Sequence, residues 1–254
     1  MSHYEAPALL ERVQALLPEG RLSARDLAPL DQFHVGGLKS TEHLAALAGL
    51  QPGWRVLDVG SGVGGPSRWL AGQGCAVTGL DLSADYVALS RHLAERAGIS
   101  LDYVQGDALD LPFADGSFDL VWTQHAAMNI PDKPRLYAEM ARVLKPGGRL
   151  ALHDVCAGEG ELLLPVPWAS RPEESHLLTP AALRQALQAA GFDILAWDGV
   201  DAAALAALSR IPPSFPPLSL ALLLGDELGR MLLNYRQNIE TKRAQVVEVI
   251  AKVT

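Results

Sequence analysis

The stretch Val56–Gly65, with the sequence VLDVGSGVGG, decides the fold of this 254-residue chain. A short apolar run that contains Asp58 passes into a turn with four glycines, and Pro66 then opens a helix. Glycine lets the backbone approach a bound ligand closely, and the first N–H groups of a helix point toward the turn. The stretch therefore predicts a buried strand, a ligand-binding turn and a helix.

The glycine spacing fits two kinds of ligand. Gly60, Gly62 and Gly65 match the G-x-G-x-x-G fingerprint of dinucleotide-binding folds. A dinucleotide would bring a pyrophosphate close to the carboxylate of Asp58, which repels it. S-adenosyl-L-methionine (SAM) instead offers an ammonium group, a sulfonium and an adenosine. We therefore expect SAM as cofactor and S-adenosyl-L-homocysteine as product; a turn that only packs strand against helix is the alternative.

Two further acids follow predicted strands. Asp81 ends the apolar run 76–81, where a carboxylate can accept both hydroxyls of a ribose. Asp107 follows a third strand near residues 101–105. Asp81 alone also suits an NAD enzyme, and Asp107 alone could be a surface turn. Three acids at three successive strand ends favour SAM.

Residues 57–65 resemble motif I of class I SAM-dependent methyltransferases. The resemblance implies that the glycine turn passes under the methionine part of the cofactor. It also implies that Asp107 accepts from the adenine amine and that Ala108 supplies a backbone N–H. The residues assigned to the cofactor are Asp58, Gly60, Ser61, Gly62, Asp81, Leu82, Asp107, Ala108 and Gln124.

The rest of the chain alternates strands and helices. We predict strands near 55–59, 76–80, 101–105, 118–122, 149–155 and 192–200, with helices near 66–72, 83–97, 134–144 and 180–190. This alternation predicts an α/β Rossmann-like, doubly wound, mostly parallel seven-stranded sheet with helices on both faces. Residues 245–253 could extend a helix, but their valines favour an antiparallel seventh strand.

Helices are expected before and after this core. Residues 7–30 have helical spacing interrupted at 18–20, and a helix near 40–50 is expected to be capped by Ser40 or Thr41. The predicted organisation is an N-terminal helical lid over 1–50, a SAM-binding core over 51–200, and a helical cap with the final strand over 201–254. These parts form one structural domain overall.

His125 is the first candidate for catalysis. It follows the fourth strand, where the resembling family places residues that face cofactor and acceptor, and it could accept a proton near neutral pH. A role in fixing its loop is the alternative. Met128, further along, could line the pocket or belong to the core.

Two more segments are candidates for the acceptor site. The loop with Gln32 and His34 resembles the N-terminal segment that folds over the cofactor in glycine, sarcosine and dimethylglycine methyltransferases. In the proline-rich loop 165–174, Trp168 could hold a methylated cation and Arg171 could clamp a carboxylate. A rigid surface loop is the alternative there. Weaker candidates in the predicted cap are Asn234, Tyr235 and Arg236.

Composition narrows the class of protein. The net charge of −8 argues against nucleic-acid binding. The N-terminus lacks the form of a signal peptide, and the apolar run 218–224 is too short to span a bilayer. Cys75 and Cys156 form no pattern and are expected to fill the core of a cytoplasmic protein. The scattered histidines predict no metal site, and we expect a monomer or homodimer.

These features predict a SAM-dependent methyltransferase acting on a small molecule, with an amine nitrogen as the expected acceptor. The alternatives are transfer to oxygen or carbon of a larger apolar natural product, consumption of SAM without an external acceptor, and a non-catalytic SAM-binding module. Within the family, the segments 31–34 and 128–133 are most similar to the sarcosine/dimethylglycine and tocopherol-type groups.

Overall fold

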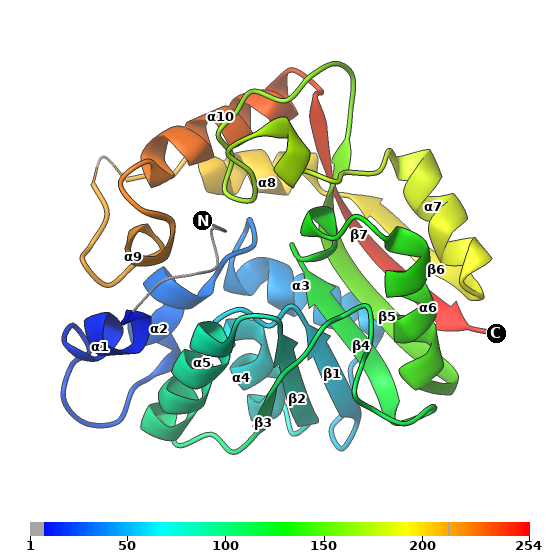
Figure 1. Ribbon diagram of the computed structural model, residues 1–254, viewed down its shortest axis with the longest axis horizontal. Helices are drawn as coiled ribbons and strands as arrows, with labels where there is room; N and C mark the ends of the chain where they lie inside the picture. Colours follow the sequence, from blue (N-terminus) through cyan, green and yellow to red (C-terminus); the bar gives the residue numbers. More distant parts are fainter. Residues whose placement is uncertain (1–7, 213) are drawn as a thin grey trace.

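The computed structural model describes residues 8–212 and 214–254, so the predicted helix start at Pro7 lies outside the described residues. One seven-stranded sheet organises them, in the order β3-β2-β1-β4-β5-β7-β6 (Figure 1). The strands are β1 (Arg55–Val59), β2 (Ala76–Asp81), β3 (Asp102–Gln105), β4 (Phe118–Gln124), β5 (Leu144–Ala157), β6 (Phe192–Gly199) and β7 (Ala244–Val253). The predicted doubly wound α/β fold is confirmed.

The sheet is parallel from β3 to β5, and β7 runs antiparallel to both β5 and β6. The antiparallel strand predicted at 245–253 is therefore confirmed. The glycine-containing stretch 145–148 was expected to form a turn between the helix near 134–144 and the strand near 149–155. This expectation is wrong: those residues belong to β5, with Gly147 at φ +76° and a register irregularity opposite Phe118–Leu120.

Helices cover both faces of the sheet. One face packs against α3 (Leu38–Ala48) and α4 (Gly65–Gly72), which meet Val56, Leu120 and Ile250. The other packs against α6 (Lys133–Val143) and α7 (Pro180–Ala189), which meet Leu57, Val121 and Val249. Strands buried on both faces explain the continuous apolar runs in the sequence.

The first helices differ from expectation in detail. The N-terminal helical region consists of α1 (Leu9–Gln14) and α2 (Ala24–Asp31). The predicted side-chain cap on α3 is wrong, because that helix begins at Leu38 after Gly37. The hydroxyl of Ser40 donates to Val35 O, and that of Thr41 donates to Gln124 Oε1. Both hydroxyls are thus used for contacts outside the helix.

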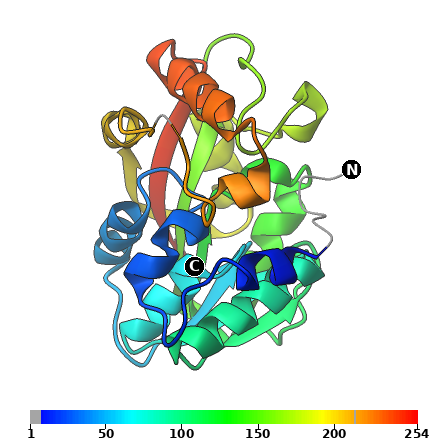
Figure 2. The same cartoon turned by 90° about the vertical axis from the view of Figure 1, so that its left-hand side faces the viewer.

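The C-terminal segment, residues 201–240, packs beside the N-terminal helices. It contains α8 (Asp201–Leu208), α9 (Ala221–Leu224) and α10 (Leu228–Glu240). Figure 2 shows this orange segment above the blue N-terminal helices, and Leu220 N donates to Pro29 O at 2.9 Å. Within the described residues, no helix is both long and apolar enough to cross a bilayer.

Candidate active site

A cavity of about 570 Å³ lies at the carboxyl ends of the parallel strands. Open parallel sheets bind their ligands at this edge, where the strand order reverses between β1 and β4. The predicted residues that line it are Gln32, His34, Asp58, Gly60, Ser61, Gly62, Asp81, Leu82, Asp107, Ala108, Gln124, His125, Met128 and Trp168. Arg171 is outside the lining; it is 71% exposed and paired with Glu174 at 2.7 Å.

The glycine turn is fixed to the neighbouring strand by backbone contacts. Gly60 N and Ser61 N both donate to Leu80 O, and Gly62 N donates to Asp81 Oδ2 at 2.8 Å. Gly60 and Gly62 have φ of +75° and +54°, conformations that favour glycine. The turn therefore presents backbone to the cavity without side chains in the way.

Two carboxylates flank this turn in different environments. Asp58 is 2% exposed, and burial raises its pKa to about 7, although Ser67 Oγ donates to it at 2.5 Å. Burial also raises the pKa of Asp81, which accepts from Ser83 N at 2.9 Å as well as from Gly62 N. Each carboxylate retains lone pairs for a ligand.

Three histidine rings meet at the end of β4 and β5. The ring centroids of His125 and His153 are 4.8 Å apart, and His34 lies 5.8 Å from His153 and 6.3 Å from His125. Burial lowers the pKa of His34 to about 4 and holds those of His125 and His153 well below the usual value. All three are therefore neutral at pH 7. Among the described residues, no group of three or more His, Cys, Asp or Glu is arranged for a metal ion.

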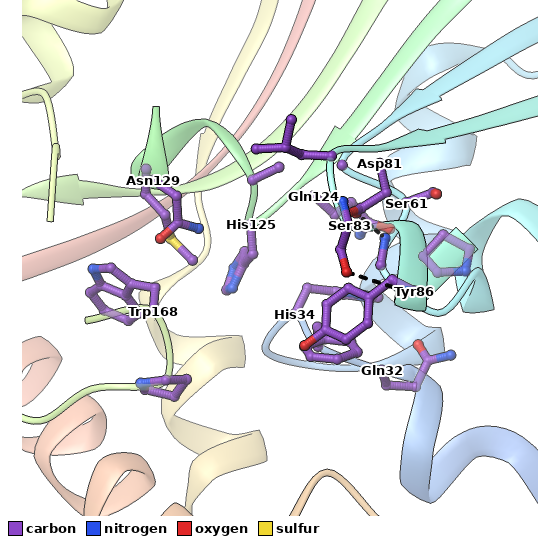
Figure 3. Close-up of a pocket in the computed structure, with 18 of the residues that line it drawn as sticks. Gln32, His34, Ser61, Asp81, Ser83, Tyr86, Gln124, His125, Asn129 and Trp168 are labelled. Carbon is purple, nitrogen blue, oxygen red and sulfur yellow. Dashed lines mark hydrogen bonds between the residues drawn. The ribbon is translucent and has the colours of Figure 1, made fainter. Parts of the chain in front are cut away.

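The cavity has a polar and an apolar half. Figure 3 shows Asp81, Ser61 and Ser83 on one side and His125, Asn129 and Trp168 on the other. Five leucines of the C-terminal segment also line the cavity: Leu208 and Leu232 belong to the hydrophobic cluster of Trp168, Leu220 and Leu224 belong to that of Phe33 and Tyr86, and the fifth is Leu228. The described lining contains five aspartates and neither lysine nor arginine. This lining favours cationic and neutral ligands and disfavours anions.

Several lining residues were not assigned from the sequence. Asn129, Leu208, Leu228 and Leu232 had no motif, and Tyr235 ranked only as a weaker candidate. The apolar segment 220–224 was expected to suit a larger apolar acceptor, and Leu220 and Leu224 do line the cavity. His153 does not line the cavity but contacts the lining residue Gln124, since its Nδ1 lies 3.3 Å from Gln124 Nε2. The signal for His153 was present: it and Asp154 interrupt an otherwise apolar run of a central strand.

Residues 57–152 match a family model described as a methyltransferase domain. Methyltransferase GfsG of Streptomyces halstedii is 38% identical over 133 residues, which cover 51% of this chain and 48% of the relative. Sterol 24-C-methyltransferase ERG6B of Gibberella zeae is 43% identical over 127 residues, covering 49% and 33%. The chain thus spans half or less of the length of these relatives.

Solved structures share the fold. A putative sarcosine dimethylglycine methyltransferase from Galdieria sulphuraria superposes with a TM-score of 0.72 at 23% identity, covering 85% of this chain and 84% of the other. A geranyl diphosphate methyltransferase in complex with SAM gives 0.70 at 21% identity, covering 85% of each chain. Residues 57–152 thus form a methyltransferase domain of the class I SAM-dependent kind, as the glycine turn predicted. SAM is the cofactor of this class.

Proposed function

We propose that this protein transfers a methyl group from SAM to a neutral acceptor with an apolar body. The observation that carries the proposal is a single cavity that joins Asp58 and Asp81 at the glycine turn to the apolar cluster around Trp168, Leu208 and Leu232. Residues 51–200 act as the cofactor-binding core, residues 1–50 as a lid and residues 201–254 as cap and final strand of the same domain.

The polar half fits SAM. Asp81 and Asp107 would accept from the ribose hydroxyls and the adenine amine, and Ala108 N–H would face the ring. Leu82, 70% exposed at the rim, offers an apolar surface for adenine. The buried hydroxyl of Ser61 has no partner among the described residues, and Asp58 would attract the ammonium group. SAM supplies a methyl group already activated on a sulfonium.

The remaining requirement is alignment of the acceptor and removal of its proton. Positioning alone can contribute roughly 7–11 kcal/mol to methyl transfer, and it needs a dry cavity. The neutral ring of His125 would accept the proton of the acceptor. His34 closes the same cluster from the N-terminal loop, and Gln32 and Met128 complete the lining.

An amine acceptor is the second candidate. The aromatic rings of Trp168 and Tyr235 pack edge to face at 5.0 Å, and the described lining has no cation that would repel an ammonium. The hydrophobic cluster around Trp168 and Tyr235 contains Met128, Leu208 and Leu232, however, and these side chains offer an ammonium no counter-ion. The neutral acceptor is therefore preferred.

A panel assay tests these candidates. We would measure release of S-adenosylhomocysteine with alkylphenols, neutral terpenoids, sterols, alkylamines and prenyl diphosphates, alongside SAM binding by calorimetry. The proposal expects turnover with neutral apolar compounds and none with the diphosphates. Turnover confined to amines would favour the second candidate. SAM binding without turnover by any acceptor would contradict both.

A further inference from the structure

Tyr235 places an unpaired hydroxyl in the wall of the acceptor half. It comes from α10, is 2% exposed, and lines the cavity. Its Oη is buried and has no hydrogen-bond partner among the described residues. A buried tyrosine hydroxyl normally has a partner, so an orphaned one on a residue that lines a cavity indicates a ligand group. Burial raises the pKa of this phenol, which keeps it as a donor.

His125 provides a second orphaned atom on the same cavity. Its Nε2 is buried without a partner, and its ring centroid lies 6.3 Å from that of Tyr235. Its backbone is held at φ +52°, and its N–H donates to His153 O at 2.8 Å. The ring is therefore fixed at the bend after β4, where His125 and Tyr235 line the same cavity as neighbours.

A buried hydrogen-bond chain stabilises the ring behind His125. Trp122 Nε1 and Thr41 Oγ1 both donate to Gln124 Oε1, at 3.0 and 3.2 Å. This orients the amide, so Gln124 Nε2 donates to His153 Nδ1. His153 thus carries its proton on Nε2, an atom that is also buried without a partner among the described residues, and its neutral ring packs edge to face against that of His125.

The two orphaned atoms need a group that both donates and accepts. A hydroxyl does this: it accepts from Tyr235 Oη and donates to His125 Nε2, and a second oxygen lone pair stays free. A neutral amine has one lone pair, and a hydrogen bond from Tyr235 would occupy it. An alkene carbon makes neither contact. We propose that Tyr235 and His125 form a binding site for a hydroxyl group, and that its oxygen is the methyl acceptor.

This inference rests on the proposed function and names the atom that is methylated. The hydroxyl oxygen forms a bond to the donor methyl carbon while its proton passes to His125 Nε2. The electron pair of the broken C–S bond stays on sulfur, and the positive charge moves from the sulfonium to the imidazolium. Tyr235 donates to the oxygen throughout and fixes its direction.

The test compares 4-butylphenol with 4-butylaniline, which differ only in the acceptor group. Binding of each to the complex with S-adenosylhomocysteine is measured by calorimetry. Wild-type protein should prefer the phenol about 3- to 10-fold, the effect of one net hydrogen bond. Tyr235→Phe should abolish this preference. Tyr137→Phe, which removes a buried hydroxyl outside the cavity lining, should keep it.

Equal binding of the two compounds, failure of the phenol to bind, or a preference that survives Tyr235→Phe would overturn the inference. Analysis of the methylated products distinguishes failure of this inference from failure of the proposed function. If active compounds of the panel are methylated on carbon or nitrogen, the hydroxyl site falls while methyl transfer stands. If SAM binds and nothing is methylated, the proposed function itself fails.

A kinetic comparison separates the roles of the two residues. With an O-methylated compound, Tyr235→Phe should mainly raise KM, and His125→Asn should lower kcat by roughly 10²–10⁴-fold. Asn tolerates the positive φ of position 125. Activity of the Asn variant within a few-fold of wild type would remove His125 as a catalytic residue.

Discussion

Replacing Gly60 by alanine tests how closely the glycine turn approaches the loop after β4. A Cβ at position 60 would lie 2.3 Å from Ala126 Cβ, far inside the normal contact distance, and φ there is +75°. The left-handed conformation costs about 1–2 kcal/mol for a residue with a Cβ. Forced overlap in a packed region costs a further ~1–3 kcal/mol. Gly60→Ala should therefore lower the free energy of unfolding by roughly 2–5 kcal/mol.

The two contributions can be separated by urea denaturation. Gly53 also has a positive φ, +84°, but open space around its Cα, so Gly53→Ala should cost only the ~1–2 kcal/mol of backbone strain. Adding Ala126→Gly to Gly60→Ala should recover ~1–3 kcal/mol beyond additivity, because it removes the overlap. Equal effects of the two alanine substitutions, or a coupling free energy within experimental error, would refute the close approach.

Three other predictions concern buried ionisable side chains. Burial raises the pKa of Asp58 to about 7, so the ionised fraction of this carboxyl increases as the pH rises through that value. SAM should therefore bind more tightly at pH 8 than at pH 6, and its binding should release protons, which calorimetry in two buffers of different ionisation enthalpy detects. A pH-independent affinity would argue against a contact between Asp58 and the ammonium. The pair Arg68–Asp31 is buried at 2.8 Å, so Arg68→Met should cost ~3–5 kcal/mol in urea, whereas Arg236→Ala, in an exposed pair, should cost less than about 1; similar losses would contradict this. The folded pKa of His34 is lowered from 6.5 to about 4, so the unfolded chain binds more protons between these values and stability falls on acidification, by up to about 3 kcal/mol. His34→Gln should flatten this part of the stability–pH curve relative to wild type, and an unchanged curve would show that His34 is not the group responsible.

The fold could be predicted because its signals are local. Each parallel strand is buried on both faces, so each appears in the sequence as an apolar run between turn residues. Asp58, Asp81 and Asp107 stand at the ends of such runs, and the carboxyl ends of parallel strands share one edge of the sheet. The part of the cavity that we assign to SAM, around these three acids, could therefore be predicted from the strand boundaries.

The acceptor half could not be predicted in the same way. Tyr235 and the five leucines come from the C-terminal segment, whose packing depends on contacts distant in sequence, such as Leu220 N with Pro29 O. The expected cap of α3 failed for a related reason: Thr41 hydrogen-bonds to Gln124 across the fold rather than to its own helix. Arg171 looked like a pocket residue, yet Glu174, three residues along, pairs with it at the surface.

The two halves of the cavity differ in what holds them. The part proposed for the cofactor is fixed by hydrogen bonds from Gly60 N and Ser61 N to Leu80 O and from Gly62 N to the Asp81 carboxylate, which substitutions in the C-terminal helices leave intact. The part of the cavity proposed for the acceptor includes side chains from α8 and α10, such as Leu208, Leu232 and Tyr235, and these helices contribute no backbone to the glycine turn. Changes in those helices can therefore alter the acceptor while the affinity for SAM is preserved. This explains physically why the glycine turn identifies the methyl donor, whereas the acceptor must be inferred from orphaned atoms such as Tyr235 Oη.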